Sequence, residues 1–363
     1  LFKHGSGTGT DMSTLRSSRE KLSGGGKPSG PLSFMRVYDQ IAAVIKSGGK
    51  TRRAAKMQSL KIHHPDIREF VTCKTQEEKK VWALIEEGFS PDEAYNSVMF
   101  QNSNLSVRVT DDFMEAVEKD GKWTTISVTT GKPVEEHSAR ELMELIAEGT
   151  RICGDPGLQY HTTINKWHTC PNSGPINASN PCSEYMFIDN SACNLASLNL
   201  MKFRREDGSF DIESFKQAIR LYIIAQEILV DNGSYPEAAI AENSHKFRPL
   251  GLGYANLGSL VMSLALPYDS DEARTWAAAI TAIMTGTAYS VSAELASFKG
   301  PFCEFEKNRQ PMLNVISMHR EHAYNIPEVH CPDYMLNAAK NAWDQALDRK
   351  STRLNSSHSS ISY

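Results

Sequence analysis

Apolar residues recur at intervals of three and four along several stretches of the chain, the spacing that places them on one face of an α-helix. Four residues define such a face in a helix that begins at about Ser33: Phe34, Val37, Ile41 and Val44. Gly48 and Gly49 would end this helix, because glycine readily adopts the left-handed conformation that closes many helices. The sequence predicts further helices over residues 77–87, 91–99, 138–153, 212–232, 272–298 and 335–349.

Shorter segments between these helices predict strands and loops. The apolar run 250–253 is typical of a strand, and the polar segment 120–123 is typical of a hairpin. Glycine-rich residues 5–9 and 23–31 predict loops, as does 174–195, which is bounded by turn-forming residues and has no helical period. Helices that alternate with short strands favour an α/β fold. No repeat of 20 to 50 residues is visible, which argues against a solenoid.

The composition of the chain argues against nucleic acid and membranes as binding partners. The chain has 363 residues, of which 40% are hydrophobic, enough to bury a large core. Its 39 basic and 43 acidic residues give a net charge of -4, so we expect no direct binding to nucleic acid. No apolar run approaches the roughly 20 residues that a membrane-spanning helix needs. We therefore expect a cytoplasmic protein that does not bind a membrane.

The seven cysteines are scattered and form no C-x-x-C pair, which argues against a disulfide framework or a structural zinc site. Most of them are expected to be small buried residues. Cys182 and Cys193 differ, because they lie among polar and turn-forming residues where a thiol stays accessible. The histidines have no metal-binding spacing, and the segment 319–322 is interpreted as a solvated polar turn. We predict no metal bound by side chains.

One short segment combines three kinds of chemistry. Asn180-Pro181-Cys182-Ser183-Glu184 places an amide, a thiol and a carboxylate within five residues, and Cys193 follows Cys182 by eleven residues. These groups can hydrogen-bond a small polyhydroxyl substrate, exchange a hydrogen atom with it and accept a proton from it. Taken alone, a five-residue pattern of this kind favours a polar loop that happens to contain a cysteine.

The segment N-P-C-S-E followed by S-A-C-N-L resembles the finger loop of ribonucleotide reductases, and its proline most resembles the adenosylcobalamin-dependent class II enzymes. Residues 154–157, 163–165 and 250–256 match the same family in the same order. The resemblance implies a partial ten-stranded α/β barrel of two antiparallel half-barrels with a central finger loop. Residues 1–349 would hold the first half-barrel, the finger at about 174–195 and the start of the second half.

The two ends of the chain differ from the family pattern. Serine-rich residues 350–363 are expected neither to extend a helix nor to bury a face, so we interpret them as a non-native tail. A native disordered terminus is the alternative. The family's second redox cysteine precedes the segment 5–9, so we expect it upstream of Leu1. With strands also missing downstream, the chain alone is expected to be inactive.

The resemblance also implies a role for each site residue. Cys182 would form a thiyl radical that abstracts the 3'-hydrogen of the ribose, because a radical at C3' weakens the adjacent C–O bond. Glu184 would act as base on the 3'-hydroxyl, and Asn180 would hold the ribose hydroxyls. Cys193 would supply one of two reducing equivalents and end in a disulfide. Adenosylcobalamin is the expected cofactor and source of the radical.

Two loops are candidates for binding nucleotides. By resemblance, Lys50, Arg52 and Arg53 would contact the substrate base, and Lys27, in the loop 23–31, would contact a dNTP or ATP effector. A P-loop is excluded, because Val44 stands where that motif needs glycine. From the residues alone, a solvated charged loop remains open.

The expected function is reduction of a ribonucleoside di- or triphosphate to the 2'-deoxyribonucleotide for DNA synthesis, as in ribonucleoside-diphosphate reductases. Expected partners are a thioredoxin-type reductant and, in the complete protein, a second copy in a homodimer. Two alternatives stay open. One is the class I large subunit, which takes its radical from a separate subunit, and the other is a nucleotide-binding module without turnover.

Overall fold

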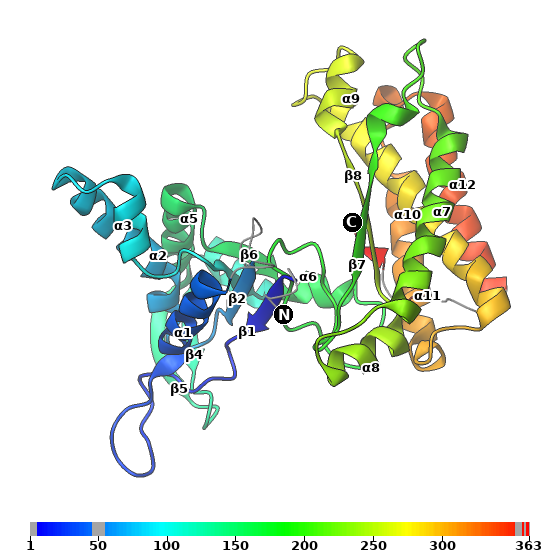
Figure 1. Cartoon of the computed structure of the whole chain (residues 1–363). Coiled ribbons are helices and arrows are strands. Elements are labelled where there is room, and N and C mark those ends of the chain that lie inside the picture. Colours follow the sequence, from blue (N-terminus) through cyan, green and yellow to red (C-terminus); the bar gives the residue numbers. More distant parts are fainter. Residues whose placement is uncertain (1–5, 46–54, 353–357, 359–360, 363) are drawn as a thin grey trace. The chain divides into compact units, whose positions relative to one another are not determined.

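The computed structural model describes residues 6–45, 55–352, 358 and 361–362. The chain forms two compact units, each with its own sheet and helices (Figure 1). The first unit comprises residues 1–166 and 177–186, and the second comprises residues 167–176 and 187–363. The finger segment is therefore divided between the units.

Four parallel strands form the sheet of the first unit, in the order β1-β2-β3-β6. They are β1 (Thr8–Asp11), β2 (Lys56–Lys61), β3 (Asn104–Val109) and β6 (Gly157–Tyr160). One face of the sheet contributes Leu60, Leu105 and Val107 to an apolar core. Helices that add buried residues to this core are α1 (Gly30–Val44), α2 (Ile67–Glu86), α4 (Asp111–Glu118) and α5 (Ala139–Cys153).

The opposite face of this sheet is polar. Side chains of parallel strands alternate between the two faces, and neighbours in register share a face. Gly9 is in register with Met57, Met57 with Asn104, and Arg108 with Gln159. The segment 177–186 packs on this polar face, as the contacts described below show.

The first unit is completed by an antiparallel hairpin and two short helices. The hairpin joins β4 (Lys122–Ile126) to β5 (Pro133–Ser138), and the helices are α3 (Pro91–Ser97) and α6 (His161–Lys166). Ser90 caps α3, because its side chain accepts from the Glu93 amide while the Glu93 carboxylate accepts from the Ser90 amide.

The second unit has a parallel sheet in the order β7-β8-β9. Its strands are β7 (Asn194–Asn199), β8 (Leu250–Ala255) and β9 (Ile361–Ser362). Its α-helices are α7 (Ile212–Asn232), α8 (Ala238–Phe247), α9 (Leu257–Ser263), α10 (Asp271–Lys299), α11 (Phe305–Tyr324) and α12 (Asp333–Thr352), with short 3-10 turns η3 (Leu200–Phe203) and η4 (Glu328–His330). Helix α7 packs along β7 and β8, and α10 packs against both α7 and α12 (Figure 1). A Cβ atom added to Gly286 of α10 would lie 2.8 Å from the Ala342 backbone, so glycine permits the close approach of α10 to α12.

The predicted α/β class and the long helices are confirmed. The predicted helix 212–232 coincides with α7, and 272–298 differs from α10 by one residue at each end. The hairpin near 120–123 and the strand at 250–253 are also present. None of the helices within the described residues is long and apolar enough to cross a membrane.

Four expectations about local structure are wrong. The glycine-rich opening contains strand β1, and α2 begins ten residues before the predicted helix start at 77. The segment 319–322 lies inside α11 instead of a turn. The serine-rich tail does continue a helix, since α12 extends to Thr352, and it does bury a residue, because His358 is fully buried.

Candidate functional site

Cys182 lies at the tip of a loop that closes on itself. Asn180 Oδ1 accepts a hydrogen bond from the Tyr185 amide at 2.9 Å, and the Ser183 amide donates to the Asn180 carbonyl at 3.1 Å. Ser183, within this turn, has a left-handed backbone conformation with φ of 67°, which is unusual for a residue other than glycine. The Cys182 side chain is exposed. The loop thus presents its thiol outward on a tightly turned backbone, as the sequence predicts.

The loop rests directly on the backbone of β1 and β3. A Cβ atom added to Gly9 would lie 1.5 Å from the Ser179 carbonyl oxygen, and one added to Gly7 would lie 2.8 Å from Pro181 Cγ. Asn104 Nδ2 donates to the Pro181 carbonyl at 2.8 Å. Gly9 therefore permits a close approach of backbone to backbone, and Gly7 permits the approach of the Pro181 ring.

A polar network extends from the sheet to the loop. Gln159 Nε2 donates to Ser179 Oγ at 2.7 Å and to Ser183 Oγ at 3.1 Å, and Gln159 Oε1 accepts from Arg108 Nη1 at 2.8 Å. Arg108 also contacts His161 Nδ1 at 2.9 Å. Burial, followed by the charges of Arg108 and Lys61, lowers the pKa of His161, which favours its neutral form. Sequence reasoning missed this network, although a polar residue inside an apolar strand, as at Arg108, was a usable signal.

Glu184 contributes a carboxylate oxygen that is buried yet has no hydrogen-bond partner among the described residues. The side chain as a whole is only half-buried, and it lies two residues from the exposed thiol. An unpaired buried oxygen is costly unless a donor reaches it. The arrangement is therefore suited to accepting a hydrogen bond from a bound hydroxyl group.

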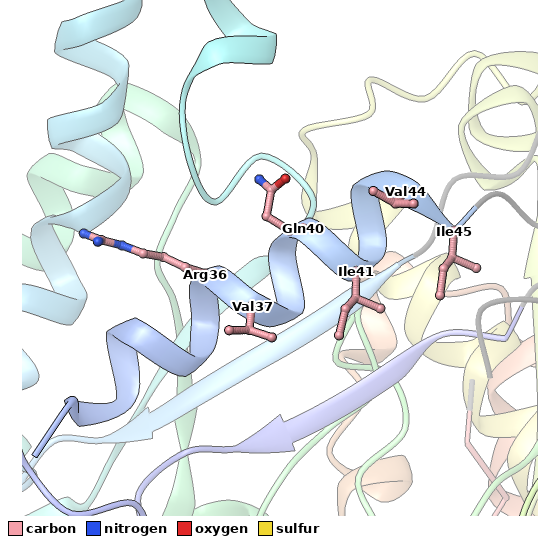
Figure 2. Close-up of a pocket in the computed structure, with 6 residues that line it drawn as sticks. All are labelled: Arg36, Val37, Gln40, Ile41, Val44 and Ile45. Atoms are coloured by element: carbon pink, nitrogen blue, oxygen red, sulfur yellow. The ribbon is translucent and has the colours of Figure 1, made fainter.

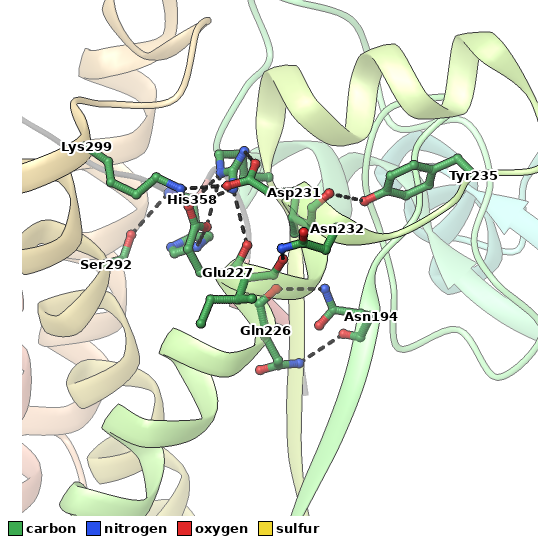
Figure 3. A network of polar contacts seen from close by, with 12 residues as sticks. Asn194, Gln226, Glu227, Asp231, Asn232, Tyr235, Ser292, Lys299 and His358 are labelled. Atoms are coloured by element: carbon green, nitrogen blue, oxygen red, sulfur yellow. Dashed lines mark hydrogen bonds and ion pairs between the residues drawn. The ribbon is translucent and has the colours of Figure 1, made fainter.

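Cys193 belongs to the second unit and directly precedes β7. A Cβ atom added to Gly251 of β8 would lie 3.5 Å from its sulfur. Gln226 of α7 holds the adjacent strand ends. Its Nε2 donates to the Asn194 carbonyl at 3.0 Å (Figure 3) and to the Gly251 carbonyl at 2.6 Å. The distance between Cys193 and Cys182, predicted to be short, stays a prediction.

A charged cluster lies next to Gln226 along α7. Glu227 is almost fully buried and accepts from Arg248 Nη2 at 2.7 Å and from Lys299 Nζ at 3.0 Å (Figure 3). Burial opposes ionisation of Glu227, but hydrogen bonds from His358, Arg248 and Lys299 outweigh it, and its pKa lies well below the usual range. The ion pairs fix Arg248, which lies two residues before Leu250 at the start of the 250–256 segment, onto α7.

The remaining predicted residues are not gathered at this loop. Lys27 is exposed in its own loop, and Lys50, Arg52 and Arg53 lie outside the described residues. Within the described part of the chain, no three His, Cys, Asp or Glu side chains are grouped to hold a metal ion.

The other cysteines mostly follow the expectation of burial. Cys73, Cys170 and Cys331 are buried, and burial raises the pKa of Cys73 to about 12. Cys303 is an exception, since its side chain is exposed. Substitution of Cys303 can therefore serve as a control for substitutions of Cys182 and Cys193.

Helix α1 carries an exposed apolar face of its own. Val37, Ile41, Val44 and Ile45 line a shallow surface hollow bordered by the polar side chains of Arg36 and Gln40 (Figure 2). Val44 is 75% exposed, although the same helix buries Met35 completely on its opposite side. Contiguous apolar surface of this kind is typical of a binding face.

Residues 1–358 match the family described as ribonucleotide reductase, barrel domain. The chain is 62% identical over 355 residues to a vitamin B12-dependent ribonucleotide reductase of Rhodopirellula baltica, covering 96% of this chain and 34% of the relative. It is 49% identical over 357 residues to one of Streptomyces avermitilis, covering 96% and 37%. A vitamin B12-dependent ribonucleoside-diphosphate reductase of Mycobacterium tuberculosis is 36% identical over 310 residues, covering 85% and 42%. The chain thus spans about a third of the length of the first two relatives.

Proposed function

The chain belongs to the ribonucleotide reductase barrel-domain family, and from this membership we propose that it carries out radical reduction of ribonucleotides to 2'-deoxyribonucleotides with adenosylcobalamin. The observation that carries the proposal is the loop at Asn180–Glu184, which combines an exposed thiol with a buried, unpaired carboxylate oxygen. The names of the relatives cited above support the B12-dependent class over the class I large subunit.

Cys182 acts on the ribose as a hydrogen-atom carrier. Its exposed sulfur can lose a hydrogen atom, abstract the 3'-hydrogen of a bound ribose and return it at the end of the reaction. The thiyl radical is regenerated by this return, so Cys182 undergoes no net change. When bound, adenosylcobalamin supplies the radical that first oxidises the thiol, and an accessible thiol without a metal-binding partner fits that task.

Glu184 and Asn180 handle the ribose hydroxyls. The unpaired Oε2 of Glu184 accepts the proton of the 3'-hydroxyl as the C3' radical promotes loss of the 2'-hydroxyl, which leaves as water with a proton from one of the two reducing thiols. Asn180 Oδ1 already accepts from the Tyr185 amide, which leaves its Nδ2 to donate to a ribose hydroxyl. The bond to the Tyr185 amide thereby fixes the direction of the Asn180 amide group before substrate arrives.

Cys193 provides one of the two reducing equivalents. Two electrons are needed to replace the 2'-oxygen by hydrogen, and they come from Cys193 and a second thiol, which together form a disulfide. The position next to Gly251 leaves room beside the Cys193 sulfur. A thioredoxin-type protein would restore the two thiols after each turnover.

The finer expectations about architecture and partners are part of the same proposal. The four-stranded and three-stranded parallel sheets would contribute strands to the ten-stranded barrel of the family, with 174–195 as its finger. The substrate is a ribonucleoside di- or triphosphate, the effector is a dNTP or ATP near Lys27, and Lys50, Arg52 and Arg53 contact the base. The exposed apolar face of α1 supports a homodimer (Figure 2). A cytoplasmic location remains part of the prediction.

The test uses the full-length gene product that contains this chain, assayed with adenosylcobalamin, a ribonucleotide and dithiothreitol. Cys182→Ser should abolish both deoxyribonucleotide formation and exchange of the cofactor's 5'-hydrogens with solvent. Cys193→Ser should keep that exchange but lose multiple turnover. Cys303→Ser, at an exposed cysteine outside the site, is the matched control and should retain full activity.

Deoxyribonucleotide formation by Cys182→Ser, or repeated turnover by Cys193→Ser, would contradict these roles. A wild-type protein that binds nucleotides without turnover would instead support the nucleotide-binding module.

A further inference from the structure

We propose that Gln159 is a positioning residue for the Cys182 thiol, acting through the serines on either side of it. The inference rests on the proposed function of Cys182, and it adds a residue from β6 that lies outside the finger sequence. Gln159 is only 3% exposed, and both ends of its amide are engaged in hydrogen bonds.

The orientation of the Gln159 amide is fixed by its neighbours. Arg108 has only donors, so its Nη1 must face Gln159 Oε1, and Nε2 must then point toward the loop. Nε2 reaches Ser179 Oγ and Ser183 Oγ, and Ser179 Oγ in turn donates to the Asn180 carbonyl at 2.9 Å. A directed chain of donors therefore runs from Arg108 through Gln159 into the loop.

The hydrogen bonds of Gln159 tie the vicinity of Cys182 to the sheet, in addition to the bonds that Asn180 makes within the loop and the close approach of Ser179 to Gly9. The thiol is exposed, and residues 171–193 contain no regular secondary structure. On one side, the Asn104 side chain holds the Pro181 carbonyl. On the other side, Gln159 holds Ser183 in its left-handed conformation, which a residue with a side chain adopts only when its surroundings impose it.

Loss of the hydrogen bonds from Gln159 should slow hydrogen-atom transfer more than it weakens binding of the ribonucleotide. Hydrogen-atom transfer needs reacting atoms about 3 to 3.5 Å apart, and a misplacement of about 1 Å can cost about 100-fold in rate. The ribose and phosphate contacts made elsewhere should be unaffected. Gln159 would therefore influence kcat strongly and KM weakly.

The experiment compares two glutamine substitutions in the full-length gene product. Gln159→Met keeps the size of the side chain and removes its hydrogen bonds, and we expect kcat to fall by about 30-fold while KM changes less than about twofold. Gln58→Met is the matched control. Gln58 is equally buried in the same sheet, lies on the opposite face by register, and neither end of its amide has a hydrogen-bond partner among the described residues. It should leave kcat unchanged.

A second readout does not depend on turnover. In the absence of cofactor, the alkylation rate of Cys182, followed peptide by peptide, and the amide exchange of residues 180–185 should both rise about 10-fold in Gln159→Met and stay constant in Gln58→Met. If Gln159→Met does not fold, Ser183→Ala removes the Gln159–Ser183 bond from the loop side and should raise both rates.

The outcomes separate this proposal from the proposed function. A full-length protein without reductase activity would refute the function, while a Gln159-specific change in Cys182 alkylation would still support the positioning role. Unchanged alkylation and exchange in Gln159→Met, or a parallel loss in both glutamine variants, would overturn the proposal.

Discussion

The loop that carries Cys182 and the strand end that carries Cys193 are held by different kinds of contact. The Cys182 loop has no regular secondary structure, and it depends on side chains such as Gln159 and on the absence of a Cβ atom at Gly9. Cys193 precedes a parallel strand pair whose register runs without interruption from Asn194 to Asn199. A backbone ladder tolerates changes of side chain, whereas a loop held by side chains does not. Single substitutions should therefore displace Cys182 more readily than Cys193.

The largest expected effect is that of Gly9→Ala. The new Cβ atom would lie 1.5 Å from the Ser179 carbonyl, and neither backbone can yield without moving the loop or β1. We expect the first unit to lose about 3 kcal/mol of unfolding free energy, or the loop to leave the sheet. Chemical denaturation and Cys182 alkylation measure the two outcomes.

Gly24→Ala is the control for that substitution, since nothing lies within 4 Å of a Cβ atom at Gly24. It should change neither measurement. Equal effects of Gly9→Ala and Gly24→Ala would show that the close approach to Ser179 does not hold the loop.

Gly251→Ala tests the second region in the same way and should cost less, about 2 kcal/mol. The added atom would lie 2.4 Å from Leu195 Cδ2, but the Leu195 side chain is 63% exposed and can rotate away. The close contact of the new Cβ atom with the Asn194 carbonyl, at 3.2 Å, cannot be relieved in this way, because that oxygen belongs to the backbone. Denaturation monitored by exchange of the β7 and β8 amides would measure the loss.

Gly258→Ala, where the nearest atoms are at ordinary contact distance, is its control and should not destabilise α9. If Gly251→Ala lowers the unfolding free energy more than Gly9→Ala does, the β7–β8 strand pair is less tolerant of substitution than the Cys182 loop.

The sequence predicts elements well where one face alone is apolar, as in α7 and α5. It misses β1, β2, β3 and β6 because these strands have only four to six residues each, which is too short for the alternation of apolar and polar residues to stand out. β1 is hidden further because Gly7 and Gly9 serve close packing, whereas glycine more often signals a turn.

The candidate site likewise contains residues that the sequence reveals and residues that it does not. The residues Asn180, Cys182 and Glu184 are adjacent in sequence, so a local pattern reveals them. Gln159 and Gln226 come from other elements and contact the segments that carry the thiols only through the tertiary fold. No spacing rule connects them to their cysteines, and only coordinates could bring them together.

Gln226→Met tests whether the second region also depends on a glutamine. The substitution removes donors to the Asn194 and Gly251 carbonyls at the start of the ladder. We expect a loss of about 1 to 2 kcal/mol, because each carbonyl keeps its other lone pair and the strands stay paired. Cys193 alkylation should rise less than about threefold, well below the change of Cys182 in Gln159→Met.

Gln310→Met, on the surface of α11, is the control and should have no measurable effect. A rise in Cys193 alkylation as large as that of Cys182 would remove the distinction between the two regions.

The smallest effect concerns pH and belongs to the second unit alone. His319 of α11 stacks on Trp343 of α12, with ring centroids 4.9 Å apart and planes at 12°, and also contacts Trp167 at 4.7 Å. Burial, with a lesser contribution from the charge of His322, lowers the pKa of His319 to about 4. The unfolded chain, with a pKa near 6.5, binds the proton more readily, so acid favours unfolding.

The contribution of His319 is therefore complete above pH 6.5 and is lost progressively as the pH falls toward 4. Between pH 7.5 and 5.5 we expect the second unit to lose roughly 1 kcal/mol through this residue. His319→Phe keeps an aromatic ring between the tryptophans but cannot be protonated, so the difference in unfolding free energy between the two pH values should shrink by that amount. Exchange of the α11 and α12 amides at both pH values would measure it. An unchanged pH dependence in His319→Phe would assign the acid sensitivity to other groups of the second unit, such as Glu227, whose hydrogen bonds hold its pKa well below the usual range.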